Sequence, residues 1–258
     1  LPADMVRSSS PVLRKLAQVY ARYPMAHDMD GPLYAGHDAA LKFYEFPEAT
    51  CAYRTKLWQW HEASLLYHAL ISLDAVKSSP QVDADTWALI RDCYVREAME
   101  GYVLNKLYYT LEKFHNSHGD YYSAMALAAG LFGAQLRMAD RHGGRFELSG
   151  PDLAHEVLDG PKGIPMFLAN AYGPDGMYHE NTYSYHVHAL KVLLPALLAL
   201  RGYSDPPDYA PSAWCAARHR PYRNLRLAPY AALFLRAVQA QDRFLRPDLT
   251  GPPFNDSF

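Results

Sequence analysis

Apolar residues recur along most of this chain at intervals of three and four residues, which places them on one face of an α-helix. Pro195 should kink one of these helices, because proline lacks the amide hydrogen and clashes with the preceding turn. Alternating β-branched runs and Asn-Gly turns are missing, so we predict an all-α domain of paired antiparallel helices. The expected helices cover about 53–76, 85–102, 118–143, 151–158, 164–171, 183–200 and 229–245, after a first helix that starts at Ser10-Pro11.

The length is enough for one large domain or two small ones, and we expect a single domain over residues 1–258. Half of the 258 residues are apolar, enough to build a sizeable core. The net charge of -2 argues against a nucleic-acid partner, although a local basic cleft could still hold an anionic substrate. No apolar run approaches the length of a membrane span. The three cysteines, Cys51, Cys93 and Cys215, fit neither a zinc motif nor a disulfide framework, and one bridge remains open.

Tyrosine and tryptophan are abundant, with 20 Tyr and 4 Trp against 10 Phe. These side chains combine an apolar face with a polar tip, which suits stacking on sugar rings. Trp58 is our candidate for such stacking. The alternative for any one of these residues is a place in the core or at an interface.

The first polar segment, Phe114–Tyr122, combines an amide, two imidazoles and two phenols at a predicted helix start. A helix N-terminus offers free backbone N–H groups and the positive end of the helix dipole, so it can hold an anion. A sugar carboxylate is one such anion. The alternative is a helix cap with exposed histidines.

The second polar segment, Gly173–His188, turns through Pro-Asp-Gly and then enters an apolar helix. Glu180, Ser184 and His188 share one helix face, as do Asn181 and Tyr185. Hydrophobic packing alone does not require so many titratable groups. The alternative is a polar helix start on the surface.

Several other chemistries lack their motifs. His186 and His188 fall on different helix faces and no His-Glu-x-x-His pattern is present, so no metal is expected. No serine-hydrolase elbow or nucleotide-binding loop is present either, so no cofactor is expected. A glycoside hydrolase needs two carboxylates and remains the main enzymatic competitor. Its candidates are Glu62, Asp120, Asp175 and Glu180, although the turn explains Asp175 better.

At these two segments the chain resembles the heparinase II/III-like polysaccharide lyases, which include alginate and oligoalginate lyases. In that family an Asn–His segment on one helix faces a tyrosine on a later helix. The later segment reads Asp-Gly, an aromatic residue, Glu, then Tyr-His, and Asp175–His186 fits this pattern. In this chain Ser117 separates Asn116 from His118, so both His115 and His118 are candidates for the family's histidine.

The resemblance implies a lyase that cleaves a uronic-acid polymer, such as alginate or a glycosaminoglycan, by β-elimination. It further implies an incomplete α/α toroid that stops before a C-terminal β-sandwich domain, and a secreted or periplasmic protein whose signal peptide lies outside this chain. A glycan-binding module without chemistry is the second alternative. The implied catalytic residues are Asn116, His118 and Tyr185, and the implied substrate-binding residues are His115, Tyr178, Glu180, Asn181, His186, His188 and Trp58.

Overall fold

The computed structural model describes residues 11–12, 14–15, 59–80, 82–104, 107, 114–140, 144–180, 182–243 and 245–248. Helices dominate this part of the chain, as predicted. None of them has the length and apolar character needed to cross a bilayer. The helices are α3 (Gln59–Val76), α4 (Ala84–Leu89), α5 (Arg96–Ala98), α6 (His118–Phe132), α7 (Gly150–Asp159), α8 (Ile164–Ala171), α9 (Tyr183–Leu200), α10 (Ala213–Ala216) and α11 (Ala228–Asp242), with π-helical stretches at Ile90–Val95 and Met99–Val103.

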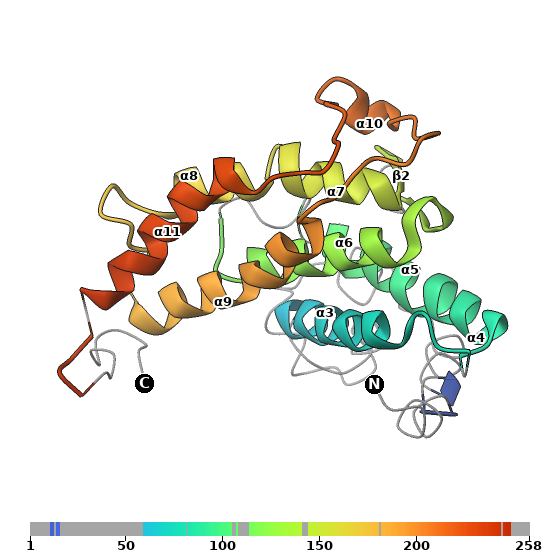
Figure 1. The fold of residues 1–258 in the computed structure, drawn as a ribbon, viewed down its shortest axis with the longest axis horizontal. Coiled ribbons are helices and arrows are strands. Elements are labelled where there is room, and N and C mark those ends of the chain that lie inside the picture. Colours follow the sequence, from blue (N-terminus) through green and yellow to red (C-terminus); the bar gives the residue numbers. More distant parts are fainter. Residues whose placement is uncertain are drawn as a thin grey trace, which may run out of the picture.

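The long helices alternate in direction along the chain (Figure 1). Helices α3, α6 and α9 run the same way, while the helical stretch from α4 to Val103, then α7 and finally α11 run back. Helix α6 lies between α3 and α7 and also packs against α9. The described residues therefore form successive antiparallel helix pairs.

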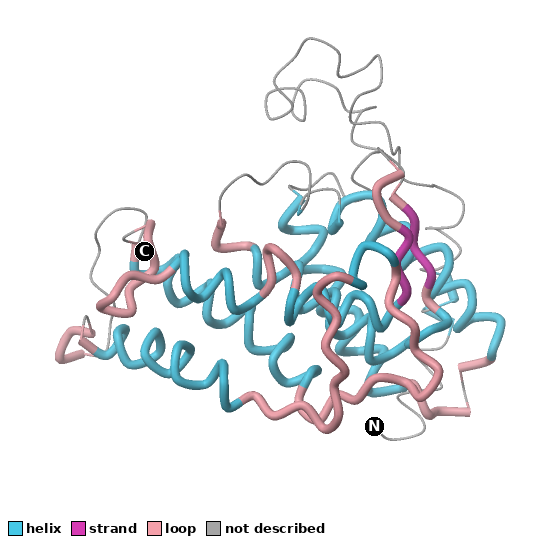
Figure 2. The backbone as a smooth tube through the Cα atoms, turned by 90° about the horizontal axis from the view of Figure 1, so that it is seen from above, coloured by secondary structure: helices cyan, strands magenta, loops and turns pink. Residues whose placement is uncertain are grey.

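A short β-hairpin was not predicted. Strand β1 (Arg137–Ala139) pairs antiparallel with β2 (Glu147–Ser149), at one edge of the helical body (Figure 2). The hairpin occupies residues that we had assigned to the preceding helix. We predicted a helix up to Gly143-Gly144, but α6 ends at Phe132, where Gly133 adopts a φ of 49°. A glycine reaches this left-handed region without the steric cost that a side chain would add.

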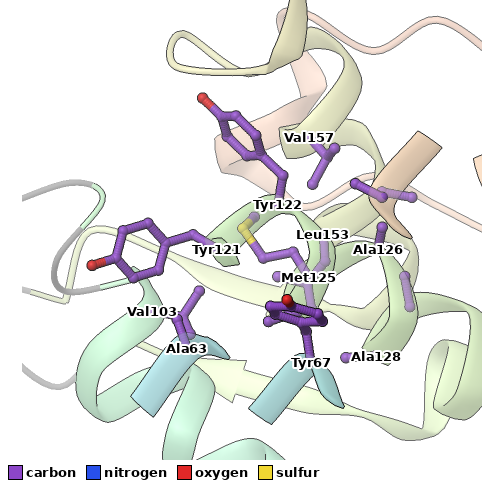
Figure 3. Packing of buried hydrophobic residues seen from close by; sticks show 14 of the residues in the cluster. Ala63, Tyr67, Val103, Tyr121, Tyr122, Met125, Ala126, Ala128, Leu153 and Val157 are labelled. Carbon is purple, nitrogen blue, oxygen red and sulfur yellow. The ribbon is translucent and has the colours of Figure 1, made fainter. Parts of the chain in front are cut away.

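Helix α6 is the centre of the core, and 12 of its 15 residues are buried. In Figure 3, Tyr67 from α3 lies against Met125, while Tyr121 and Tyr122 leave α6 on different sides. Small side chains such as Ser123 and Ala124 allow neighbouring helices to come close. A helix that is apolar on all sides is stable only when other elements surround it, as they do here.

Ser123 also forms hydrogen bonds with backbone groups of α9 next to Pro195. Its hydroxyl donates to the carbonyl of Val192 at 2.6 Å and accepts the N–H of Ala196 at 3.0 Å. The hydroxyl is thus inserted between two groups that an unbroken helix would pair directly, a recognised cause of helix kinks. The junction of α6 and α9 therefore depends on both packing and specific hydrogen bonds.

Candidate functional site

The first polar segment begins as a turn before α6. Asn116 and Ser117 are buried there, at 9% and 2% exposure, whereas His115 is exposed. The Ser117 hydroxyl lies 2.7 Å from Nδ1 of His115 and 3.3 Å from Oδ1 of Asn116. This local network fixes the turn and leaves the His115 imidazole accessible.

His118 is enclosed in the core. Its exposure is 0%, its ring stacks on Phe167, and its Nδ1 accepts the N–H of His115 at 2.9 Å. The described residues provide no hydrogen-bond partner for its Nε2. Desolvation by burial lowers the pKa of His118 to about 3, because burial disfavours the charged imidazolium. We therefore correct the prediction that His118 is a catalytic residue: in this structure it is a neutral core residue that holds the start of α6.

We expect His118 to make the fold sensitive to acid. Its pKa is about 3 in the folded state and near the ordinary 6.5 when unfolded, so the unfolded chain takes up the proton first. The stability contributed by the neutral ring is complete above about pH 6.5 and is lost as the pH falls toward 3. By linkage, about 2 kcal/mol should be lost between about pH 8 and pH 5.

Urea unfolding of the wild type and His118→Phe at these two pH values measures this loss. The variant should lose less stability on acidification than the wild type. Part of the pH dependence should remain, because burial also lowers the pKa of His186. Equal losses in the two proteins would contradict the assignment.

The second polar segment opens with a tight turn. The N–H of Gly176 donates to the carbonyl of Gly173, and Oδ1 of Asp175 accepts the N–H of Met177 at 3.0 Å. Asp175 thus serves the turn, as the sequence suggested. Tyr178 then forms an isolated antiparallel β-bridge with Tyr172. Its side chain is 0% exposed, and this burial raises the pKa of its phenol. Tyr178 is consequently a core residue, and the prediction that it binds substrate is corrected.

His186 connects three elements inside the protein and is also 0% exposed. Its Nδ1 accepts the N–H of Tyr178 at 3.2 Å, and its Nε2 donates to the carbonyl of Ala237 at 2.9 Å. The carbonyl can only accept, so the proton resides on Nε2. This geometry joins the turn, α9 and α11, and the predicted substrate contact of His186 is corrected to a structural role.

The two polar segments meet in space. Nε2 of His179 donates to the carbonyl of Phe114 at 3.0 Å, across 65 positions of sequence. In helices α6 and α9, which follow these two residues, Nε2 of His188 lies 3.6 Å from Oδ2 of Asp120. The two segments that the sequence singled out therefore form one region at the starts of α6 and α9.

His188 and Asp120 are the most informative pair in this region. The Asp120 carboxylate has 0% exposure, whereas 35% of the His188 side chain is exposed. One side of the imidazole thus faces solvent while the other faces a buried carboxylate. At 3.6 Å the contact is electrostatic and longer than a hydrogen bond.

The remaining candidates differ in access to solvent. Tyr185 and Glu180 are partly buried, and His179 is exposed. Trp58 and Asn181 lie outside the described residues. The accessible groups of the region are therefore His115, His179, Glu180, Tyr185 and His188. Asn116 is 9% exposed and is the least accessible of the candidates that reach the surface.

Sequence reasoning did not pair Asp120 with His188 and considered Asp120 only as a glycosidase carboxylate. No spacing rule links positions 120 and 188, because the contact depends on how two separate helices cross. The usable signal was weaker: an aspartate follows Asn116 and His118 in the first polar segment.

Comparisons of this chain with family models, curated proteins and solved structures give no match. The geometry and chemistry of the side chains therefore carry the functional assignment.

Proposed function

We propose that this chain is the helical part of a polysaccharide lyase that cleaves a uronic-acid polymer by β-elimination. The observation that carries the proposal is the meeting of the two polar segments, which places Tyr185 one helical turn before the His188–Asp120 pair. The substrate would be an anionic polysaccharide or oligosaccharide.

The helix arrangement supports the fold expected of such an enzyme. Paired helices that alternate in direction are the repeating unit of an α/α toroid, and the described helices alternate in this way. We propose that they form an incomplete toroid. Its helix starts at α6 and α9 would then share one rim, where a polymer can be bound.

The reaction needs a base for the C5 proton, an acid for the C4 oxygen and hydrogen-bond donors to the carboxylate. Accessible side chains of the region can serve these three roles. The C5–H bond breaks, its electrons form the C4–C5 double bond, and the C4–O bond breaks as that oxygen takes up a proton. Developing charge on the neighbouring carboxylate must be stabilised by hydrogen bonds. The Asn116 amide and the exposed His115 imidazole can donate them.

We assign the two proton transfers to Tyr185 and His188. The Tyr185 phenol donates to the leaving C4 oxygen, and neutral His188 accepts the C5 proton while Asp120 stabilises the resulting imidazolium. Each such group typically contributes about a hundred- to ten-thousandfold in rate. His188 thus replaces His118 as the catalytic histidine of the proposal, since His118 is fully buried.

Incubation of the full-length protein with alginate, heparan-type and hyaluronan-type polymers tests the proposal. We expect at least one polymer to give products with new ultraviolet absorbance, because the C4–C5 double bond is conjugated to the carboxylate. Cleavage without unsaturation would favour a glycoside hydrolase, and binding without cleavage would favour a glycan-binding module. Either result would overturn the proposal.

A further inference from the structure

Three side chains with metal-ligating atoms converge away from the polar segments. They are His155 on α7 and, from the segment between α9 and α11, Asp205 and His219. One ligand atom from each lies within 4.8 Å of the others. We propose that His155, Asp205 and His219 bind a divalent transition-metal ion, for which zinc is the best fit, and that this ion fastens the 201–227 segment to α7.

The hydrogen bonding of the two imidazoles favours a metal ligand role. Nε2 of His155 lies 2.7 Å from Oδ1 of Asp205. Nδ1 of His155 and Nδ1 of His219 are buried, and the described residues give neither of them a hydrogen-bond partner. A buried nitrogen lone pair without a partner costs about 1–3 kcal/mol. A metal ion bound by Nδ1 of His219 would remove this cost for that ring, whereas His155 would bind the ion through Nε2, the atom that faces Asp205.

The distances suit a shared ion. Zinc binds histidine nitrogen and carboxylate oxygen at about 2.0–2.2 Å, which in a tetrahedral site holds neighbouring ligand atoms about 3.4 Å apart. His155 and Asp205 need to separate only slightly to reach that spacing. The ligand atom of His219 lies within 4.8 Å of the other two, so its imidazole has to rotate toward them to reach that spacing. Three protein ligands leave a fourth position for water.

The surroundings orient the ligands in the way that metal sites require. Oδ2 of Asp205 accepts the N–H of Tyr222 at 2.7 Å, which fixes the carboxylate. The rings of Tyr209 and Tyr222 pack against His155, which is 2% exposed. Such outer contacts limit solvent access and set the orientation of the ligands.

The nearby arginines do not compete for Asp205. Arg218 is ion-paired with Glu156 at 2.5 Å, and Arg220 is ion-paired with Asp159. Both guanidinium groups are thus engaged with α7 carboxylates. The Asp205 carboxylate contacts His155 and the N–H of Tyr222, with the Tyr203 phenol nearby, and a cation would balance its charge.

The proposed ion would attach the 201–227 segment to α7. The 201–227 segment holds only one short helix, α10, yet it covers α7 along much of its length. Three carboxylates of α7, those of Asp152, Glu156 and Asp159, already bind this segment through hydrogen bonds and ion pairs. A metal ion between His155 on α7 and two positions 14 residues apart in this segment would fasten it, because metal-binding free energy adds to folding stability.

The test uses the full chain freed of metal by a chelator and then titrated with zinc chloride. We expect binding of about one zinc ion per chain and a rise in the melting temperature that the chelator reverses. His219→Gln and Asp205→Asn should weaken zinc binding by about 100-fold or more. The matched control is His68→Gln, which changes an exposed histidine on α3 and should bind zinc like the wild type.

Cobalt(II) provides a second readout that does not depend on stability. The wild type and His68→Gln should develop visible absorption bands of a four-coordinate site, whereas His219→Gln should not. Circular dichroism verifies that the variants are folded, and His219 is only partly buried, so its replacement is tolerable. Zinc that leaves the wild-type melting temperature unchanged, or that binds His219→Gln as tightly as the wild type, would overturn the proposal.

Discussion

Replacing Tyr185 with phenylalanine is expected to lower the turnover of a uronate polymer by about a hundredfold or more, as loss of a proton-transfer group does. The change removes one hydroxyl from a partly buried ring that packs against the core, so the ring itself keeps its place. Melting temperature and the ultraviolet rate assay together measure the effect. The expected result is a folded protein with little β-elimination activity.

Tyr183→Phe is the matched control for this variant. Tyr183 begins the same helix, and burial together with the nearby Asp242 raises the pKa of its phenol. Asp242 belongs to α11, and Tyr183 lies five positions before His188, about 140° away around the helix. Its variant should keep turnover within about twofold of wild type, far less than the loss expected for a proton-transfer group. Near-normal turnover by Tyr185→Phe, or equal losses in both variants, would remove Tyr185 from the mechanism.

The second large effect is expected at Gly119, where α6 crosses α9. A Cβ atom there would lie 2.6 Å from Cγ2 of Val192 and 2.8 Å from the backbone nitrogen of Leu193. Backbone atoms cannot move aside as a flexible side-chain end can, so the helices must separate. Forcing extra carbon into a packed core typically costs about 1–3 kcal/mol, occasionally more. We therefore expect Gly119→Ala to lower the free energy of unfolding by about 2 kcal/mol.

Gly130→Ala is the internal control, since Gly130 belongs to the same helix. A Cβ atom at Gly130 would meet nothing within 4 Å. Alanine is preferred over glycine inside a helix by about 1 kcal/mol, so this variant should be slightly more stable than the wild type. Urea unfolding of both variants measures the contrast. Equal effects of the two substitutions would mean that α6 and α9 do not pack as closely as described.

The Gly119 variant also links packing to the candidate site. His188 lies one turn before Val192, so any separation of the helices moves its imidazole from Asp120. We therefore expect Gly119→Ala to reduce lyase activity under conditions where the protein is still folded. Unchanged activity would argue that the His188–Asp120 contact is dispensable.

The sequence predicted most of the helices well. The expected helices at 164–171 and 183–200 match α8 and α9. Other boundaries shifted. The helix expected from position 85 begins at Ala84, after Asp83, whose carboxylate accepts the N–H of Thr86, and α6 ends at Phe132, well before the expected Gly143-Gly144. The hairpin of β1 and β2 was missed, because strands of three residues are too short to display a periodicity.

The candidate site was predicted in outline but not in its members. The sequence singled out both polar segments, and the structure brings them together through His179 and Phe114. It did not distinguish accessible from buried histidines: His118 and His186 are enclosed, while His188 is accessible. His118 and His186 each appear in a polar run, and neighbours in sequence do not reveal what other helices cover.

The sequence by itself determined the helical class of this protein and the two polar segments, because periodicity and local composition depend on residues within a few turns of each other. Only the tertiary structure decided which histidine meets Asp120, and only it gathered His155, Asp205 and His219, which we had not expected to form a metal site. These contacts join positions about 14 to 70 residues apart. They depend on the crossing of helices and the path of a loop, and hydrophobic periodicity encodes neither.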